Sequence, residues 1–296
     1  MGELAALASA VGWAGTSTAL ARLSSDYDAP VLSSLRLLFA TPFLVLIFFA
    51  GPESAPVDLT SLPVLALVAS GLIGYGVGDT AYIRTMHRVS IQRVAPTTTA
   101  AWVAISAAGG ILFLDEPVAW TLLLGGTAIV AGCWLIVARR TQALSVAPPG
   151  AWTAGQTLVA ILVVATAWAM ATLLLAGARG SMSSAVAALI RIPSGGLTLG
   201  LIALVGNRRR PSTGRLPRGR DLALIATVGL LGTGLGSWLY IYAVGEAGAA
   251  RAVILNATSP LMAIPLAMLF LRERPTRPVL AGTVLCVLGT VVVLQS

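Results

Sequence analysis

The chain of 296 residues contains no lysine, one histidine and two cysteines, so several chemistries lack the side chains that they need. Without lysine, no cofactor of the retinal or pyridoxal type can be held as a Schiff base. His87 is expected at a loop edge, too peripheral to activate a buried serine, and no Gly-x-Ser-x-Gly sequence occurs. Cys133 and Cys286 fall in separate apolar stretches with no histidine or second thiol nearby, which indicates buried thiols. The sequence therefore predicts no cofactor, no metal and no catalytic residue.

Charged residues are also scarce: they make up 10% of the chain, whereas a soluble domain carries roughly a quarter. Hydrophobic residues account for 57% and gather in stretches long enough to cross about 30 Å of hydrocarbon as helices. The first stretch lacks a basic leading region and contains Glu3, which indicates a spanning helix rather than a cleaved signal. We predict an all-α membrane protein with ten transmembrane helices, at approximately residues 2–21, 30–50, 62–83, 92–114, 118–138, 152–176, 183–206, 221–243, 248–271 and 277–294.

The basic residues, all arginine, give a net charge of +8 and concentrate in alternate loops. One side of the membrane receives only Arg179 and Arg251, and the other receives Arg22, Arg84, Arg88, Arg93, Arg139, Arg140, Arg208, Arg209, Arg210, Arg215, Arg218, Arg220, Arg272, Arg274 and Arg277. The positive-inside rule makes the arginine-rich side cytoplasmic, which places both termini on the external side of a cell inner (plasma) membrane. This topology explains the charge better than nucleic-acid binding does, although the run from Arg208 to Arg220 could also attract anionic lipid headgroups.

The chain contains an internal repeat at offsets of 155 to 158 residues. The repeat pairs Gly71–Gly78 with Gly229–Gly236, Tyr82 with Tyr240, Trp13 with Trp168, Arg36 with Arg191 and Glu116 with Glu273. Each half has five helices, and this odd number makes the second half enter the membrane from the opposite face. We therefore expect two inverted five-helix repeats, at 1–140 and 152–296, joined by a cytoplasmic connector at 141–151. Inverted repeats place a site near the bilayer midplane at their interface, so we expect a central cavity there.

Several motifs resemble those of a known family. The second repeat contains Leu235-Gly236-Ser237-Trp238-Leu239-Tyr240-Ile241-Tyr242-Ala243, Ala252, Asn256-Ala257-Thr258-Ser259-Pro260 and Leu271-Arg272-Glu273-Arg274, and the first repeat echoes it in Gly78 to Tyr82 and Leu114-Asp115-Glu116-Pro117. In these motifs, in helix number and in duplication, the chain resembles the EamA-type transporters of the drug/metabolite transporter (DMT) superfamily. The resemblance implies metabolite transport but no particular substrate. The first repeat lacks a proline equivalent to Pro260, so its fourth helix is expected to pack or bend differently.

Polar and aromatic side chains recur at matched positions of the two halves. The third helix carries Tyr75, Asp79 and Tyr82 on one α-helical face, and its repeat partner carries Thr233, Ser237 and Tyr240. Such stripes face a shared cavity or, alternatively, supply hydrogen bonds between helices. Together with aromatic residues expected near mid-membrane, they predict a substrate-binding cavity lined by Trp13, Thr16, Tyr75, Asp79, Tyr82, Trp102, Trp168, Ser237, Trp238, Tyr240 and Asn256. An aromatic wall suits amino acids, aromatic metabolites or organic cations, whereas core packing or lipid contact is the alternative for each aromatic residue.

Charged residues within the spans are the candidates for coupling. Asp79 is the one acidic residue clearly inside an apolar span, where insertion costs about 2.5–3.5 kcal/mol, and Arg36 is placed to pair with it. This pair is either static, or Asp79 binds a proton or a substrate amine during transport. Arg191, expected near the outer face within reach of Glu116 or Glu246, either captures a carboxylate or phosphate with its planar fork or braces the fold.

Glu116 and Glu273 close their helices immediately before short turns. We interpret both as structural carboxylates that accept the free N–H groups of the helix that follows.

The sequence as a whole favours a secondary transporter, an exporter or exchanger of small organic metabolites such as amino acids or organic cations, that works by alternating access. It contains no phosphate-binding Gly-x-x-x-x-Gly-Lys loop for an ATP-driven mechanism. A lipid flippase or a membrane sensor with the same cavity is the principal alternative, and an intramembrane enzyme is more remote because no paired carboxylates share a membrane-buried face. We expect the lipid bilayer and a small-molecule substrate as partners, proton coupling as one option, no nucleic acid, and a monomer or homodimer.

Overall fold

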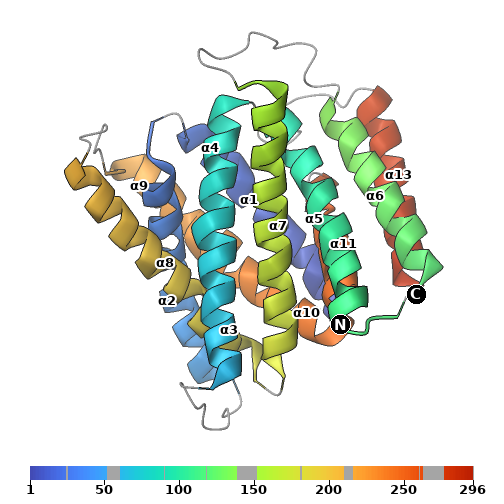
Figure 1. Cartoon of the computed structure of the whole chain (residues 1–296), viewed down its shortest axis with the longest axis horizontal. Coiled ribbons are helices and arrows are strands. Elements are labelled where there is room, and N and C mark those ends of the chain that lie inside the picture. The colour runs from blue at the N-terminus through green and yellow to red at the C-terminus, as the bar shows by residue number, and fades with distance from the viewer. Residues whose placement is uncertain are drawn as a thin grey trace.

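A computed structural model describes residues 1–24, 26–51, 61–89, 91–117, 119–138, 152–180, 182–209, 216–259, 261–262 and 277–295. These ranges contain no strand, and their helical runs stand side by side (Figure 1). In order they are α1 (Gly2–Leu23), α2 (Ala29–Ala50), the continuous run α3 (Leu62–Gly71), η1 (Leu72–Asp79) and α4 (Thr80–Arg88), α5 (Ile91–Phe113), α6 (Trp120–Ala138), α7 (Ala154–Arg179), α8 (Ser184–Arg209), the continuous run α9 (Gly219–Thr227), η3 (Val228–Leu235) and α10 (Gly236–Ala247), α11 (Ala249–Asn256) and α13 (Arg277–Leu294). The predicted all-α membrane architecture is confirmed.

Local sequence sets several helix starts. Thr153 and Gln156 form a capping box at the start of α7, in which the Gln156 backbone N–H donates to the Thr153 hydroxyl at 3.3 Å and the Thr153 N–H donates to the Gln156 side chain at 3.0 Å. Proline occupies the first turn of α2 and of α3, where its missing N–H removes no helical hydrogen bond. Because such signals are local, the helices begin within two residues of the expected positions.

Some predicted features lie outside the described residues. They are the connector at 141–151, Pro260, the motif at 271–274 with its Glu273, and the end of the expected ninth span from residue 263.

The glycine-rich repeat is wound differently from the α-helix that the sequence led us to expect. η1 and η3 are π-helical over eight residues each, and they occupy equivalent positions in the two halves. π-Helical turns bond each N–H one residue further back than an α-helix does, and they are frequent at functional sites. The wider turn still places residues four apart on nearly the same face, so Tyr75 and Asp79 continue to point the same way.

The two halves run in opposite directions. In Figure 1 the run from α3 to α4 rises from the lower to the upper end, whereas its repeat partner, from α9 to α10, descends. A side chain at Gly71 would collide with the backbone carbonyl of Arg191, and one at Gly229 would place its Cβ 2.7 Å from the carbonyl of Arg36. Gly71, directly before η1, and Gly229, within η3, each let the helix run pack closely against the arginine-bearing helix of the opposite half. The two contacts are equivalent, as expected for halves that are related by a pseudo-two-fold axis.

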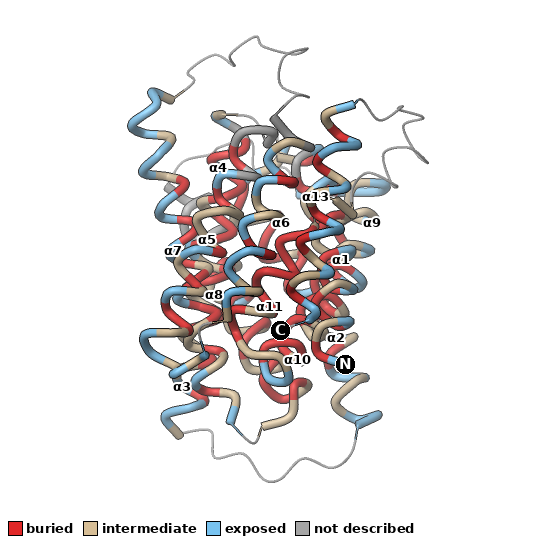
Figure 2. Tube along the Cα trace, turned by 90° about the vertical axis from the view of Figure 1, so that its right-hand side faces the viewer, coloured by how far each residue is buried: buried red, intermediate tan, exposed pale blue. Residues whose placement is uncertain are grey.

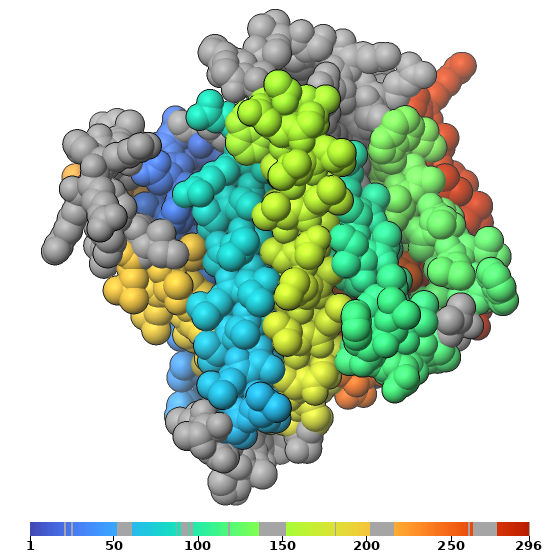
Figure 3. Space-filling model, viewed as in Figure 1, coloured from blue at the N-terminus to red at the C-terminus, as the bar shows by residue number. Residues whose placement is uncertain are grey.

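The outer surface is apolar, as lipid contact requires. Six described helices are long and apolar enough to cross a membrane, and Thr97–Phe113 and Trp120–Leu135 are shorter apolar helices. Figure 2 shows buried residues gathered along the inside of the bundle and exposed ones along its outer faces. On the face in Figure 3, side chains of α3, α7, α5 and α6 close the surface. Outward side chains such as Phe49 and Val159, 79% and 62% exposed, would be unfavourable in water but match hydrocarbon.

Helices α6 and α13, the fifth helix of each half, pack against each other through glycines. A Cβ at Gly132 would lie 2.6 Å from the Cys286 sulfur, and one at Gly289 would lie 2.7 Å from the Gly125 carbonyl oxygen. This close approach brings the Cys133 and Cys286 sulfurs to 3.6 Å. Both thiols are buried, as predicted, but the expectation that neither has a second thiol nearby is wrong, because the repeat joins segments far apart in sequence.

Candidate functional site

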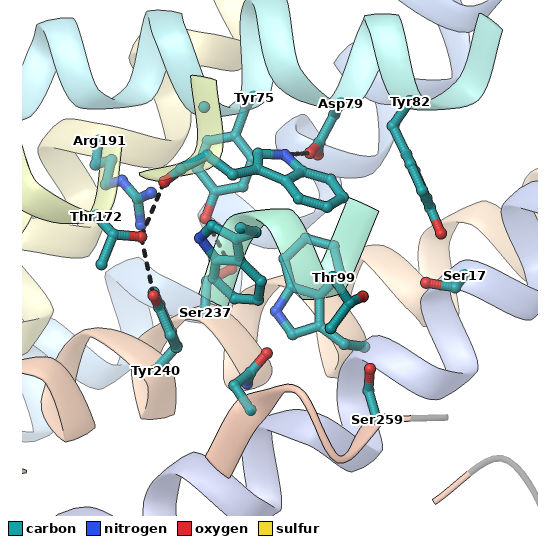
Figure 4. Close-up of a pocket in the computed structure, with 15 residues that line it drawn as sticks. Ser17, Tyr75, Asp79, Tyr82, Thr99, Thr172, Arg191, Ser237, Tyr240 and Ser259 are labelled. Atoms are coloured by element: carbon teal, nitrogen blue, oxygen red, sulfur yellow. Dashed lines mark hydrogen bonds between the residues drawn. The ribbon is translucent and has the colours of Figure 1, made fainter. Parts of the chain in front are cut away.

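A cavity of about 80 Å³, enough for several water molecules, lies between the two halves (Figure 4). The first half contributes α1, η1, α4 and α5, and the second contributes α7, α8, α10 and α11. The lining residues are Trp13, Ser17, Gly74, Tyr75, Asp79, Tyr82, Thr99, Trp102, Trp168, Thr172, Arg191, Ser237, Tyr240, Asn256 and Ser259. The cavity therefore sits at the seam of the repeats.

Aromatic rings form one continuous wall of the cavity. The ring centroid of Trp168 lies 5.0 Å from that of Tyr82 and 5.8 Å from that of Trp102, which it meets edge to face. Trp102 in turn lies 6.2 Å from Tyr240. These separations are those of stabilising aromatic pairs, so the wall is preorganised for an apolar or aromatic solute.

Hydroxyl groups bridge the two halves across the cavity. The Tyr75 hydroxyl donates to Ser237 Oγ at 2.9 Å, which joins the two polar stripes expected from the repeat. The Asn256 amide of α11 donates to Ser9 Oγ of α1 at 2.9 Å. A second hydroxyl pair, Thr172 with Tyr240 at 2.9 Å, lies within the second half. Side-chain hydrogen bonds of this kind average only about 0.6 kcal/mol each in membranes, so these uncharged contacts can be exchanged at low cost.

Asp79 is fully engaged beside the cavity. One carboxylate oxygen forms an ion pair with Arg36 Nη2, and the other accepts a hydrogen bond from Trp168 Nε1 at 2.9 Å. Arg36 is completely buried, and its Nε and Nη1 have no hydrogen-bond partner among the described residues. The Trp13 ring lies over this guanidinium at 5.6 Å. The pair considered in the sequence analysis therefore exists, with the arginine behind the cavity wall and the carboxylate on it.

Arg191 lies elsewhere than expected. Its Nε donates to Ser70 Oγ at 2.9 Å, and its guanidinium stacks over the Tyr75 ring at 5.0 Å. Neither Glu116 nor Glu246 pairs with it: Glu246 lies 3.9 Å from Arg179 instead. The expectation failed because it assigned Arg191 to the nearest acidic residues at the same membrane depth, whereas the side chain turns inward to the seam.

Glu116 accepts two backbone N–H groups, but not from the next helix. Its carboxylate oxygens accept from Ala249 N at 2.5 Å and from Ala250 N at 3.0 Å, at the start of α11 in the other half. Gly248 precedes these residues with φ +84°, and a Cβ there would lie 2.9 Å from Glu116 Oε1. The expected capping chemistry is present, and the expected recipient helix is wrong because the inversion brings the other half closer.

Ten of the predicted cavity or coupling residues line the cavity: Trp13, Tyr75, Asp79, Tyr82, Trp102, Trp168, Ser237, Tyr240, Asn256 and Arg191. Thr16, Trp238 and Arg36 do not. Thr16 is buried against Gly232, and the Trp238 ring packs 6.4 Å from that of Tyr242. The lining residues that the prediction omitted are Ser17, Gly74, Thr99, Thr172 and Ser259. Each residue turns an α-helix by 100°, so Ser17, four residues after Trp13, lies closer to the Trp13 face than Thr16, which is three residues after it. The position of Trp13 on the helix would therefore have favoured Ser17.

Two charged residues of opposite sign line the cavity. They are Asp79 and Arg191, and no other described lining residue is charged. Within the described ranges, no group of three or more His, Cys, Asp or Glu side chains could hold a metal ion. The cavity thus offers aromatic faces, hydroxyls, an amide and a guanidinium, a set suited to binding an organic solute.

Comparisons with known proteins agree with this architecture. The EamA-like transporter family matches residues 1–138 and 156–295. A protein of Archaeoglobus fulgidus, named an uncharacterized transporter, is 22% identical over 293 residues, which cover 98% of this chain and 97% of that protein. A crystal structure of another protein superposes with a TM-score of 0.76 at 15% identity, over 99% of this chain and 98% of that one. The structural likeness shows the fold.

Proposed function

Because this chain belongs to the EamA-like transporter family and is a multi-pass membrane transporter, we propose that it carries a small organic metabolite by alternating access. The single observation that supports this most is the position of the cavity, whose wall is built from helices of both inverted halves. A cavity at such a seam opens to either compartment when one half rocks against the other.

Part of the seam at the cavity is held only by uncharged hydrogen bonds, which supports the proposed motion. The hydrogen bond from the Tyr75 hydroxyl to Ser237 and the one from the Asn256 amide to Ser9 can exchange at low cost. Charged groups also join the halves, in the Arg251–Glu3 ion pair at 3.0 Å and the Glu116 cap on α11, and we propose that these contacts break or rearrange during the motion. The π-helical turns η1 and η3 border the same seam and supply two symmetry-related places at which helices can bend. We propose that these turns are where the halves move against each other.

The family and the relative's name point to a transporter rather than an enzyme.

We propose secondary transport in a cell inner membrane, in which the solute is either exchanged for another or driven by an ion gradient. The arginine-rich helix ends fit this orientation, since the C-terminal ends of α1 and α4 and the N-terminal ends of α9 and α13 share one end of the bundle in Figure 1.

Reconstituted liposomes test the proposal directly. The full chain should move radiolabelled aromatic amino acids, organic acids or amines, and each solute is measured with and without a pH gradient. Trp168→Ala, which removes the centre of the aromatic wall, should slow this flux strongly, whereas Trp238→Phe, which lies off the lining, should not.

Two outcomes would refute metabolite transport. Rapid scrambling of fluorescent lipid without solute flux would indicate a flippase. Saturable solute binding without flux in either direction would indicate a sensor.

A further inference from the structure

We propose that Arg191 binds a carboxylate in the cavity, so that the transported solute is an organic acid with an aromatic or apolar body and not an organic cation. This inference rests on the proposed transport function and assigns its substrate class. It follows from which charges at the cavity are already neutralised.

The charged groups at the site do not cancel. Arg36, Asp79 and Arg191 are buried within one cluster of helices, and they carry two positive charges and one negative charge. Both oxygens of the carboxylate are occupied, one by Arg36 and one by Trp168. A solute ammonium group would therefore find no free carboxylate on the described lining, and it would also meet the positive charge of Arg191.

Arg191 is the group left without a counter-ion. The side chain is 5% exposed, and within the described part of the chain its partners are a serine hydroxyl and a tyrosine ring, both neutral. A neutral partner orients a guanidinium but leaves its charge uncompensated in a low-dielectric site. A carboxylate supplied by the solute would neutralise it with two parallel hydrogen bonds to the planar fork.

The surroundings of Arg191 leave room for such a ligand. The Ser70 hydroxyl accepts a hydrogen bond from Arg191 Nε and donates to the Ala171 carbonyl at 2.5 Å. These bonds hold the guanidinium through Nε and do not use its two terminal nitrogens. Nη2 lies on the Gly74 side, where an added Cβ would be 3.4 Å from it and 2.9 Å from the Ala171 Cβ, so the absence of a side chain at Gly74 lets the guanidinium pack there. Arg191 itself lines the cavity, so the space for a ligand beside its guanidinium is the cavity.

The aromatic wall defines the rest of the solute. In Figure 4, Arg191 lies beside Tyr75 and Thr172 at one end of the drawn group. From Thr172 the lining continues through Tyr240 to Trp102 and Trp168. A carboxylate at Arg191 would therefore direct an attached ring along this wall, as in an arylalkanoic acid.

Binding of three matched compounds to the full chain in nanodiscs of zwitterionic lipid tests the assignment. The compounds are 3-phenylpropanoate, L-phenylalanine and 2-phenylethylamine, which share a ring and differ in the carboxylate and the ammonium. Tryptophan fluorescence reports binding, because Trp13, Trp102 and Trp168 line the cavity. We expect the acid to bind most tightly, the amino acid less tightly, and the amine at least about tenfold more weakly than the acid.

Variants then assign the preference to one side chain. Arg191→Gln should weaken 3-phenylpropanoate binding at least about tenfold, and Arg191→Lys should weaken it less, because lysine keeps the charge but loses the fork. The neutral 3-phenylpropanamide should bind the Arg191→Gln variant and the natural chain with equal affinity. Equal affinity would show that the cavity of the variant is intact. Arg220→Gln removes an equal charge from an exposed position on α9 and should change nothing.

The compound series on the natural chain decides the matter even if an Arg191 variant does not fold. An amine or amino acid that binds more tightly than the acid would overturn the assignment, as would Arg191→Gln binding the acid normally. Flux separates this inference from the transport proposal. Acid binding that depends on Arg191 without flux would refute transport alone, and flux of amines but not acids would refute the substrate class alone.

Discussion

Replacing Asp79 by asparagine should destabilise the protein by leaving Arg36 charged and unpaired inside the membrane. Asp79 is the only carboxylate in contact with Arg36 among the described residues, and Arg36 has no exposed surface. Its Nε and Nη1 already have no hydrogen-bond partner there, so no second acceptor is at hand. Asparagine has a single acceptor oxygen, so it keeps the hydrogen bond from the Trp168 indole only by turning its amide nitrogen toward Arg36.

The magnitude follows from the burial of the pair. Removing one partner of a buried ion pair costs about 3–5 kcal/mol, because the remaining charge stays desolvated. We expect about 3–5 kcal/mol for Asp79→Asn, since its one side-chain oxygen cannot accept from both Trp168 and Arg36. The double variant Arg36→Gln, Asp79→Asn replaces both charges with neutral amides and should be more stable than Asp79→Asn, because no charge is then left buried and unpaired.

Reversible unfolding in mixed detergent micelles, followed by circular dichroism, measures both values, and the two single variants complete a double-mutant cycle. A double variant less stable than Asp79→Asn would refute the reasoning. Two buried amides would then lower the free energy of unfolding more than one unpaired buried charge does. The double variant also separates the two roles of Asp79. If Asp79 carries a proton during transport, this variant should bind solute but lose accumulation driven by a pH gradient, whereas unchanged accumulation would make the pair structural.

Three further predictions concern contacts between the halves. Glu116→Gln should lower stability by about 1–2 kcal/mol in the same unfolding assay, because a neutral amide interacts more weakly with a helix N-terminus; no change would show that the cap carries little energy. Gly71→Ala should destabilise by about 1–3 kcal/mol, since its methyl group meets the Arg191 carbonyl, and a neutral result would contradict this packing. Copper phenanthroline should link Cys133 to Cys286 within one chain, seen as loss of maleimide-polyethylene glycol labelling after denaturation; continued labelling of both thiols would contradict their 3.6 Å separation.

The sequence was sufficient for features that depend on local pattern. Helix starts depend on caps, prolines and apolar length, and the repeat indicated the inverted arrangement before any contact was known. Most cavity residues were also predicted, because polar and aromatic side chains recur at matched mid-membrane positions of the two halves. The domain boundaries at 1–140 and 152–296 stay predictions, as do the functional roles of the individual cavity residues.

Features that depend on how the halves meet could not be predicted. Nothing near Glu116 in the sequence indicates α11 as its partner, and the inward turn of Arg191 to Ser70 is set by packing across the seam. The π-winding of η1 and η3 also escaped prediction, because a glycine-rich apolar stretch is equally compatible with α-helical winding. The proximity of the two thiols is another contact made only by the assembled halves.

The cap that Glu116 places on α11 has a consequence for biosynthesis. Translation makes the N-terminal half first, so this carboxylate is already in the bilayer when Ala249 and Ala250 leave the ribosome. Without it, α11 would enter lipid with two unsatisfied N–H groups at its start. The earlier half thus acts as a template for the later one, and two halves synthesised as separate chains should complete this helix only after they meet.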